Sequence, residues 1–168
     1  MEHSGRIIKG IGSFYTVLTD EGEFVCKARG KFRKMGTSPV PGDMVTFEVV
    51  EDGKGYLSEI LPRKNTLVRP AVSNVDKLMI VMAASLPKPD FSLTDKLLVQ
   101  CEIAGIIPVI ILNKCDEQDG EIKDAVLSQY GPCGYTVLSL SAETGEGMDA
   151  LKAEIKDNTK IQICASVF

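Results

Sequence analysis

The sequence contains no hydrophobic run long enough to cross a bilayer, which takes roughly 20 apolar residues in a helix. Its N-terminus, MEHSGRIIKG, has no extended apolar segment after a basic start, so a secretory signal is not predicted. The five cysteines are widely spaced and form no C-x-x-C pair, which argues against a disulfide framework and a zinc knuckle. The single histidine, His3, supports neither a catalytic triad nor a metal site. These absences favour a cytoplasmic protein without a membrane partner.

A phosphate-binding loop is also missing from the place where a nucleotide site would normally have one. Many GTPases carry G-x-x-x-x-G-K-[ST] early in the chain and the guanine-reading box N-K-x-D after it. Here Asn113, Lys114, Cys115 and Asp116 form the box, but the 112 residues before it contain no such loop. The sequence therefore has the base-reading part of a nucleotide site without an upstream phosphate-binding part.

The charge distribution divides the chain in two. Residues 1–70 contain 11 Lys and Arg against 9 Asp and Glu, whereas residues 71–168 contain 8 against 14. Such an asymmetry suggests two modules with different partners. We predict a first domain over residues 1–66 and a second over residues 67–168, with the proline-containing and charged segment 62–74 as the linker.

The first module is predicted to be a small β-barrel. Short β-branched runs alternate with glycine-containing turns and show no helical period: RIIKGIGSFYTVLT, EFVCKARG, DMVTFEVV and YLSEIL. This pattern and the length of about 65 residues favour a five-stranded barrel of the oligonucleotide/oligosaccharide-binding (OB) type. An SH3-like barrel has the same statistical profile and stays open as an alternative.

The second module is predicted to be an α/β domain. Continuous apolar runs, typical of strands buried on both faces, alternate with amphipathic helical stretches. The first helix is expected over residues 91–105, with Ser92 or Thr94 as its N-cap and Gly105 at its end. The βαβαβαβ order predicts a parallel sheet with helices on both faces. The four expected strands are 77–85, 108–112, 135–141 and the closing IQICASVF.

The N-K-x-D box has the chemistry to read guanine. A carboxylate only accepts hydrogen bonds, so Asp116 could accept from both N1–H and the 2-amino group, neither of which adenine offers. Asn113 could bridge the base and neighbouring loops, and the stem of Lys114 could lie across the base. Ser141 and Ala142 follow the next strand, where a backbone N–H would meet guanine O6. A chance match would be a strand followed by a polar turn; the position after PVIIL favours guanine binding.

A basic stretch, KARGKFRK, lies within the predicted barrel. Its cations are candidates for RNA phosphate contacts, and Phe32 could stack on a base. The alternative is a solvated basic loop of the kind that many proteins carry. The candidate RNA-binding residues are Lys27, Arg29, Lys31, Arg33 and Lys34.

Together these motifs resemble one family, the ribosome small subunit-dependent GTPase A family, also called RsgA or YjeQ. The resemblance extends over essentially the whole chain. It rests on C-x-A-R-G-K-F-R-K (26–34), V-P-G-D (40–43), R-K-N-T-L-V-R-P (63–70), A-V-S-N-V-D-K (71–77), G-I-I-P-V-I-I-L-N-K-C-D (105–116) and S-A-E-T-G-E-G (141–147).

The resemblance implies an OB domain followed by a circularly permuted P-loop GTPase domain, in which the guanine box precedes the phosphate loop. It implies GTP and GDP as ligands, and the 30S subunit with its 16S rRNA as partners in late maturation of that subunit. The P-loop, the Mg²⁺ site and the C-terminal zinc domain are expected only beyond residue 168, so this chain would hold a truncated, partial GTPase domain. The protein is expected to be a monomer.

Three functional hypotheses follow from the residues and the resemblance. In the first, the chain is the front part of a ribosome-biogenesis GTPase and by itself does not hydrolyse GTP. In the second, it is a non-catalytic ribosome- or RNA-binding module. In the third, it is an unrelated OB-containing translation factor with an α/β appendage.

Overall fold

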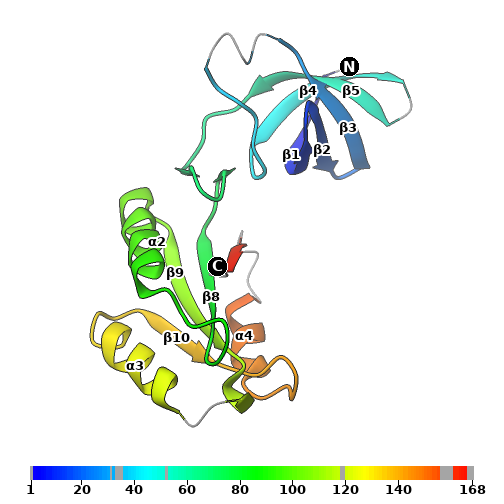
Figure 1. The fold of residues 1–168 in the computed structure, drawn as a ribbon. Coiled ribbons are helices and arrows are strands. Elements are labelled where there is room, and N and C mark those ends of the chain that lie inside the picture. Colours follow the sequence, from blue (N-terminus) through cyan, green and yellow to red (C-terminus); the bar gives the residue numbers. More distant parts are fainter. Residues whose placement is uncertain are drawn as a thin grey trace. The chain divides into compact units, whose positions relative to one another are not determined.

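The computed structural model describes residues 2–30, 32, 36–51, 53–117, 120–155 and 161–165. The chain forms two compact units, Met1–Asn74 and Val75–Phe168, which are treated separately below (Figure 1). Among the described residues, no helix is long and apolar enough to span a membrane.

The first unit is a closed five-stranded barrel with the strand order β1-β2-β3-β5-β4. Strand β3 pairs with β5 in parallel, and β1 pairs with both β2 and β4 in antiparallel fashion, so the barrel has no free edge. This confirms the prediction of an OB-type barrel. Its strands are β1 (Glu2–Ile11), β2 (Phe14–Thr19), β3 (Gly22–Ala28), β4 (Met44–Glu51) and β5 (Lys54–Ile60).

Inward-facing side chains at alternate strand positions fill the barrel. The buried core cluster consists of Ile7, Val17, Cys26, Phe32, Val45, Phe47 and Leu57. Phe32 belongs to this core and is only 5% exposed. The idea that Phe32 stacks on a base is therefore wrong, because its ring is already occupied by packing within the barrel.

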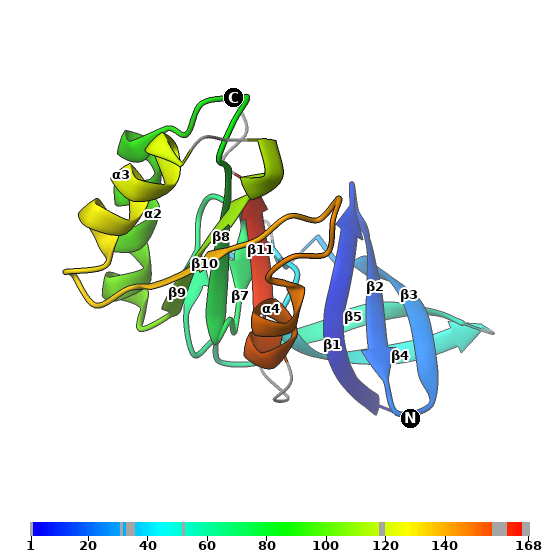
Figure 2. The same cartoon turned by 90° about the horizontal axis from the view of Figure 1, so that it is seen from below.

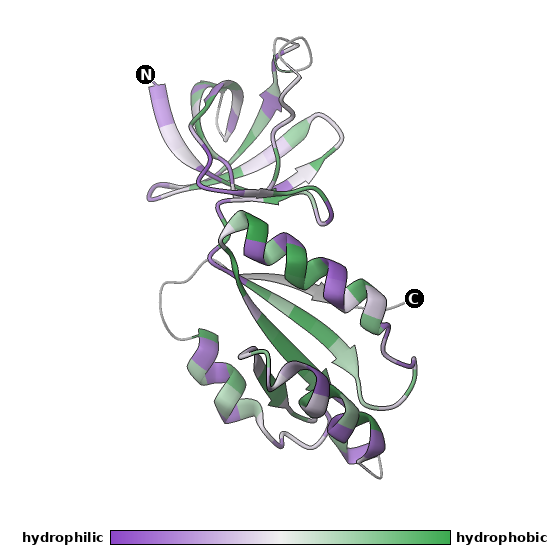
Figure 3. Cartoon of the chain, turned by 90° about the vertical axis from the view of Figure 1, so that its left-hand side faces the viewer, coloured by the Kyte–Doolittle hydropathy of each residue, from purple (hydrophilic) through white to green (hydrophobic). Residues whose placement is uncertain are grey.

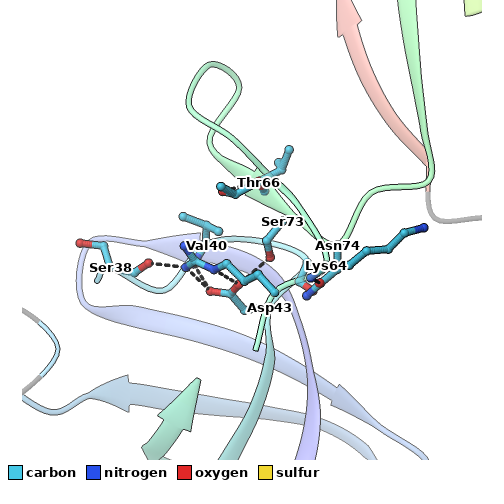
Figure 4. Close-up of polar contacts among 10 residues, drawn as sticks. Ser38, Val40, Asp43, Lys64, Thr66, Ser73 and Asn74 are labelled. Carbon is cyan, nitrogen blue, oxygen red and sulfur yellow. Dashed lines mark hydrogen bonds and ion pairs between the residues drawn. The ribbon is translucent and has the colours of Figure 1, made fainter. Parts of the chain in front are cut away.

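The segment expected to be a linker instead packs against the barrel (Figure 4). The Asp43 carboxylate is fully buried and accepts from Arg63 Nε at 2.7 Å, Arg63 Nη2 at 2.8 Å and Ser73 Oγ at 2.5 Å. It also accepts from Val40 N–H at 2.9 Å, and Asn74 Nδ2 donates to Gly42 O at 3.0 Å.

Gly42 allows this close approach, since it has a φ of +95° and a Cβ there would lie 1.9 Å from Ser73 O. Two short strands, β6 (Thr66–Leu67) and β7 (Val72–Ser73), complete the segment as a hairpin. The boundary between the units accordingly follows Asn74, later than the predicted boundary after residue 66.

The second unit has a four-stranded parallel sheet in the order β10-β9-β8-β11. Its two central strands are almost uniformly hydrophobic (Figure 3), because they are buried on both faces. The strands are β8 (Lys77–Ala83), β9 (Ile107–Asn113), β10 (Thr136–Ser139) and β11 (Ile161–Ala165). The parallel sheet was predicted and is confirmed.

Helices cover both faces of this sheet. In Figure 2, α2 (Phe91–Ala104) and α3 (Glu121–Tyr130) lie on one side and α4 (Met148–Ile155) on the other. Residues of α4 pack on a buried cluster of Met79, Val109, Ile111 and Leu140.

The ends of α2 are defined by one polar cap and one glycine. Asp90 is its N-cap and accepts from Leu93 N–H at 3.0 Å, so the expectation of Ser92 or Thr94 at this position is wrong. Gly105 ends the helix in the left-handed conformation, as predicted. Tyr130 Oη of α3 donates to Asp95 of α2 at 2.9 Å; burial and this carboxylate raise the pKa of the phenol.

Candidate guanine-binding site and basic surface

The N-K-x-D box begins at the carboxyl end of β9, the edge at which open α/β sheets bind ligands. Asn113 is the last residue of the strand, and its Oδ1 accepts from Ala142 N–H at 3.0 Å. The backbone supports the same alignment, because Leu140 N–H donates to Leu112 O at 2.9 Å and Cys115 N–H to Leu140 O at 3.2 Å. Two segments 29 residues apart in the sequence thus form one site.

Lys114 adopts a left-handed backbone conformation with a φ of +65°, which is unusual for a residue other than glycine. This conformation turns the chain from β9 into the 3-10 turn η1 (Cys115–Glu117). Lys114 Nζ donates to Leu86 O at 3.1 Å and lies 3.8 Å from Glu117 Oε1. The lysine stem is thereby held along the surface between the box and the loop after β8.

Glu117 is fixed in turn by Ser85, whose Oγ donates to Glu117 Oε2 at 2.6 Å. The structure therefore connects the box to the carboxyl end of β8 as well as to that of β10. Strained backbone that is held by several neighbouring contacts is typical of functional sites.

The loop that follows Ser141 is closed by several internal hydrogen bonds. Ser141 is fully buried, and its Oγ accepts from Thr144 N–H at 3.1 Å. The backbone closes the loop, with Ser141 N–H donating to Glu146 O and Gly145 N–H to Ser141 O, both at 2.9 Å. Gly147 has a φ of +74°, and a Cβ there would lie 2.4 Å from Ser139 O.

The predicted guanine-binding residues are thus brought to one edge of the sheet. Asp116 is exposed on η1, where its carboxylate can accept from a ligand. Ser141 is buried, and its hydroxyl accepts a hydrogen bond from within the loop. The Ala142 N–H, which lies in the segment expected to supply an N–H to guanine O6, donates to Asn113 Oδ1. A bound guanine carbonyl would therefore compete with Asn113 for this donor.

Two of the predicted RNA-binding residues lie within the described structure. Lys27 is exposed on β3, with Nζ 5.9 Å from the centroid of the Phe14 ring. Arg29 is exposed just after β3, forms an ion pair with Glu48 and lies 5.8 Å from the Tyr56 ring centroid. Lys31, Arg33 and Lys34 lie outside the described residues.

No group of three or more potential metal ligands occurs among the described residues, so neither a zinc nor a magnesium site can be assigned in that part of the chain. Cys115, at the variable position of the box, donates its thiol hydrogen to Leu112 O at 3.2 Å. In the barrel, burial raises the pKa of the Cys26 thiol to about 11, which keeps it protonated and unreactive near neutral pH.

The fold is that of an OB barrel followed by part of a circularly permuted GTPase domain. Family models match both units: "RsgA GTPase" over residues 60–166 and "RsgA N-terminal domain" over residues 4–57. The chain belongs to the RsgA GTPase family.

Similar proteins support this membership. A curated relative from Caldanaerobacter subterraneus, "Small ribosomal subunit biogenesis GTPase RsgA", is 46% identical over 91% of this chain and 52% of its own length. A relative of the same name from Ruminiclostridium cellulolyticum is 44% identical over 94% of this chain and 52% of its own length. The chain therefore spans about half the length of the curated relatives that it matches.

Solved structures have the same fold. "Crystal structure of YjeQ from Thermotoga maritima" is 30% identical, with a TM-score of 0.78 over 98% of this chain and 60% of that one. "The crystal structure of YloQ, a circularly permuted GTPase" is 31% identical, with a TM-score of 0.72 over the same shares.

Sequence reasoning missed the role of Asp43, Arg63 and Ser73. All three lie within motifs that were quoted for the family resemblance, but the motifs alone do not show that these side chains meet. The available signal was the aspartate of V-P-G-D and an arginine 20 residues later in the sequence.

Proposed function

We propose that this chain is the RNA-binding and guanine-binding part of a GTPase that acts in the cytoplasm in late maturation of the small ribosomal subunit. The observation that carries the proposal is the hydrogen bond from Ala142 N–H to Asn113 Oδ1, which joins the N-K-x-D box to the loop after the next strand. Family membership and the names of the curated relatives support the biological role.

In this proposal the nucleotide is GTP or GDP, and each residue of the site has a separate task. Asp116 accepts from N1–H and the 2-amino group of the base, and adenine is rejected because it leaves the carboxylate unpaired. The Asn113 amide NH₂ is a donor toward the base while its Oδ1 holds the Ala142 loop. Lys114 places its aliphatic stem beside the base, and Ser141 keeps the loop in shape.

Hydrolysis needs groups that this sequence does not contain. Phosphoryl transfer depends on a phosphate loop, its lysine and Mg²⁺, and no G-x-x-x-x-G-K-[ST] occurs in the 168 residues. We therefore expect the purified chain by itself to bind guanine nucleotides weakly and to show no GTP turnover. Mg²⁺ and a structural Zn²⁺ belong to the proposal only for a full-length protein.

The barrel is proposed to contact 16S rRNA within the 30S subunit, with the protein acting as a monomer. Lys27 and Arg29 supply exposed positive charge beside β3. Lys31, Arg33 and Lys34 extend the basic sequence. Phosphate contacts of this kind release counterions, so binding should weaken steeply as salt concentration rises.

Base recognition is tested with the variant Asp116→Asn. Saturation-transfer NMR measures the binding of GDP and of xanthosine diphosphate (XDP) to the 168-residue chain. We expect the variant to lose GDP signal and gain XDP signal, because the 2-oxo group of xanthine needs a donor. Asp124→Asn, an exposed carboxylate on α3, is the matched control and should change neither signal. An unchanged preference for GDP in Asp116→Asn would refute the assignment.

Subunit binding is tested by co-sedimentation with purified 30S subunits. Charge reversal of Arg29, Lys31 and Arg33 to Glu should release the chain from the pellet. Reversal of Lys88, Lys96 and Lys123 to Glu, three exposed lysines of the second unit, changes the total charge by the same amount and should leave binding intact. A wild-type chain that stays in the supernatant at low salt would contradict the proposed partner.

A further inference from the structure

Strand register places two exposed aromatic rings and a lysine in one row across three neighbouring strands of the barrel. Phe14 on β2 pairs with Lys27 on β3, and Lys27 pairs with Tyr56 on β5. Directly paired residues point to the same face of a sheet. The two rings therefore lie on the outer face, with Lys27 between them, two strand spacings or roughly 10 Å apart.

This row lines a groove of about 550 Å³, a volume typical of ligand sites. Phe14 is 55% exposed and Tyr56 is 41% exposed, although both rings are large and apolar. Such side chains on an outer surface call for an explanation, since the barrel already has a complete core. Val25 and Val50 add apolar surface to the same groove.

The charged residues in the described lining of the groove are two lysines. Lys27 and Lys54 line it, and its described lining contains no acidic residue. Arg29 lies over the Tyr56 ring and forms an ion pair with Glu48, so these two residues together add no net charge beside the groove. Alternating cations and exposed rings are suited to a ligand that presents flat π-surfaces joined by anionic groups.

We infer that this groove binds single-stranded RNA, with one unpaired base stacked on Phe14 and another on Tyr56, and with phosphates contacted by Lys27 and Lys54. The inference deepens the proposed function and rests on it, because it assumes that the barrel is the RNA-binding part. It assigns base stacking to two rings on the outer face in place of Phe32, which is buried in the core. A duplex hides its base faces, so the groove should select unpaired RNA.

The test is fluorescence anisotropy of the complete 168-residue chain with a labelled single-stranded RNA of about 12 nucleotides, within the site size of an OB barrel. Phe14→Ala and Tyr56→Ala should each weaken binding about 5- to 150-fold, the effect of losing one stacked base. Tyr56→Phe keeps the ring and should bind like wild type. Leu18→Ala, an equally exposed apolar residue on β2 outside the groove, should also have no effect.

Salt dependence separates stacking from charge. Lys27→Ala should lower the slope of log affinity against log salt concentration by about 0.7, the value for one phosphate contact on a single strand. Phe14→Ala should leave the slope unchanged while weakening binding at every salt concentration. Circular dichroism spectra that match wild type will show that each variant keeps the barrel.

Equal affinity of Phe14→Ala, Tyr56→Ala and wild type would overturn the inference, and so would equal binding of the same RNA as a duplex. The groove would then be reassigned to an apolar protein segment. These results are independent of 30S co-sedimentation. If the alanine variants still bind RNA and sediment with 30S subunits, the groove assignment fails and the proposed function stands; if the wild-type chain binds neither, the proposed function fails as well.

Discussion

Replacement of Asp43 by alanine should destabilise the first unit strongly. The carboxylate is fully buried and accepts from two nitrogens of Arg63, from Ser73 Oγ and from Val40 N–H. Removing one partner of a buried ion pair generally costs about 3–5 kcal/mol, because the remaining charge is left without compensation. The Arg63 side chain is 23% exposed and can recover some hydration, which places the expected loss near the lower end, about 3 kcal/mol.

A loss of this size is a large fraction of the 5–15 kcal/mol that typically stabilises a domain. The sequence contains no tryptophan, so urea unfolding is best followed by far-UV circular dichroism. Hydrogen exchange of barrel amides, measured by mass spectrometry, separates the first unit from the second. Asp43→Asn keeps the shape of the side chain but removes its charge, and because both carboxylate oxygens accept from donors, its NH₂ would face one of these donors. This variant should therefore be destabilised as well, although it leaves no cavity.

A double-mutant cycle with Arg63→Ala isolates the contribution of the pair. The double variant should be less destabilised than the sum of the two single variants, because it leaves no unpaired charge. A loss below about 1 kcal/mol for Asp43→Ala, the size of an exposed ion pair, would refute the reasoning. It would mean that residues 62–74 are held to the barrel by apolar packing instead.

Three smaller predictions follow from single positions. Burial raises the pKa of the Cys26 thiol from 9.0 to about 11, so stability present below pH 9 should decline by about 2 kcal/mol as the pH rises to 11; urea titrations should show that Cys26→Ala lacks this decline. Gly147→Ala should accelerate hydrogen exchange in residues 140–147, since its Cβ would lie 2.4 Å from Ser139 O. Unchanged exchange would contradict the conclusion that this close approach holds the loop after Ser141 in place. Asp90→Ala should cost about 1 kcal/mol through loss of the α2 cap, measured by urea unfolding.

Most of the fold could be predicted from the sequence because its patterns are local. Short β-branched runs separated by glycine-containing turns predicted the barrel, and the apolar runs at β8 and β9 predicted the buried parallel strands. The α2 cap was misassigned because Asp90, Ser92 and Thr94 are all good capping residues. Only the backbone conformation shows which of them precedes the first helical turn.

The candidate guanine site could also be predicted, since its residues form two short motifs that each follow a strand. The geometry within the site could not be predicted from the sequence. Nothing in the sequence indicates that the Ala142 N–H donates to Asn113 Oδ1 in the folded chain. That hydrogen bond depends on the register between β9 and β10. Strand pairing fixes this register, and it cannot be read from the composition of the two segments.

The sequence by itself determined the classes of the two units and the family, because periodicity, turn residues and contiguous motifs are properties of neighbours along the chain. Only the tertiary structure decided the roles of residues that are distant in sequence. It placed Phe32 in the core, joined Asp43 to Arg63 and Ser73, and aligned Phe14 with Lys27 and Tyr56. The physical reason is that many polar and aromatic side chains look alike along the sequence. Strand register and close packing decide which of them come into contact.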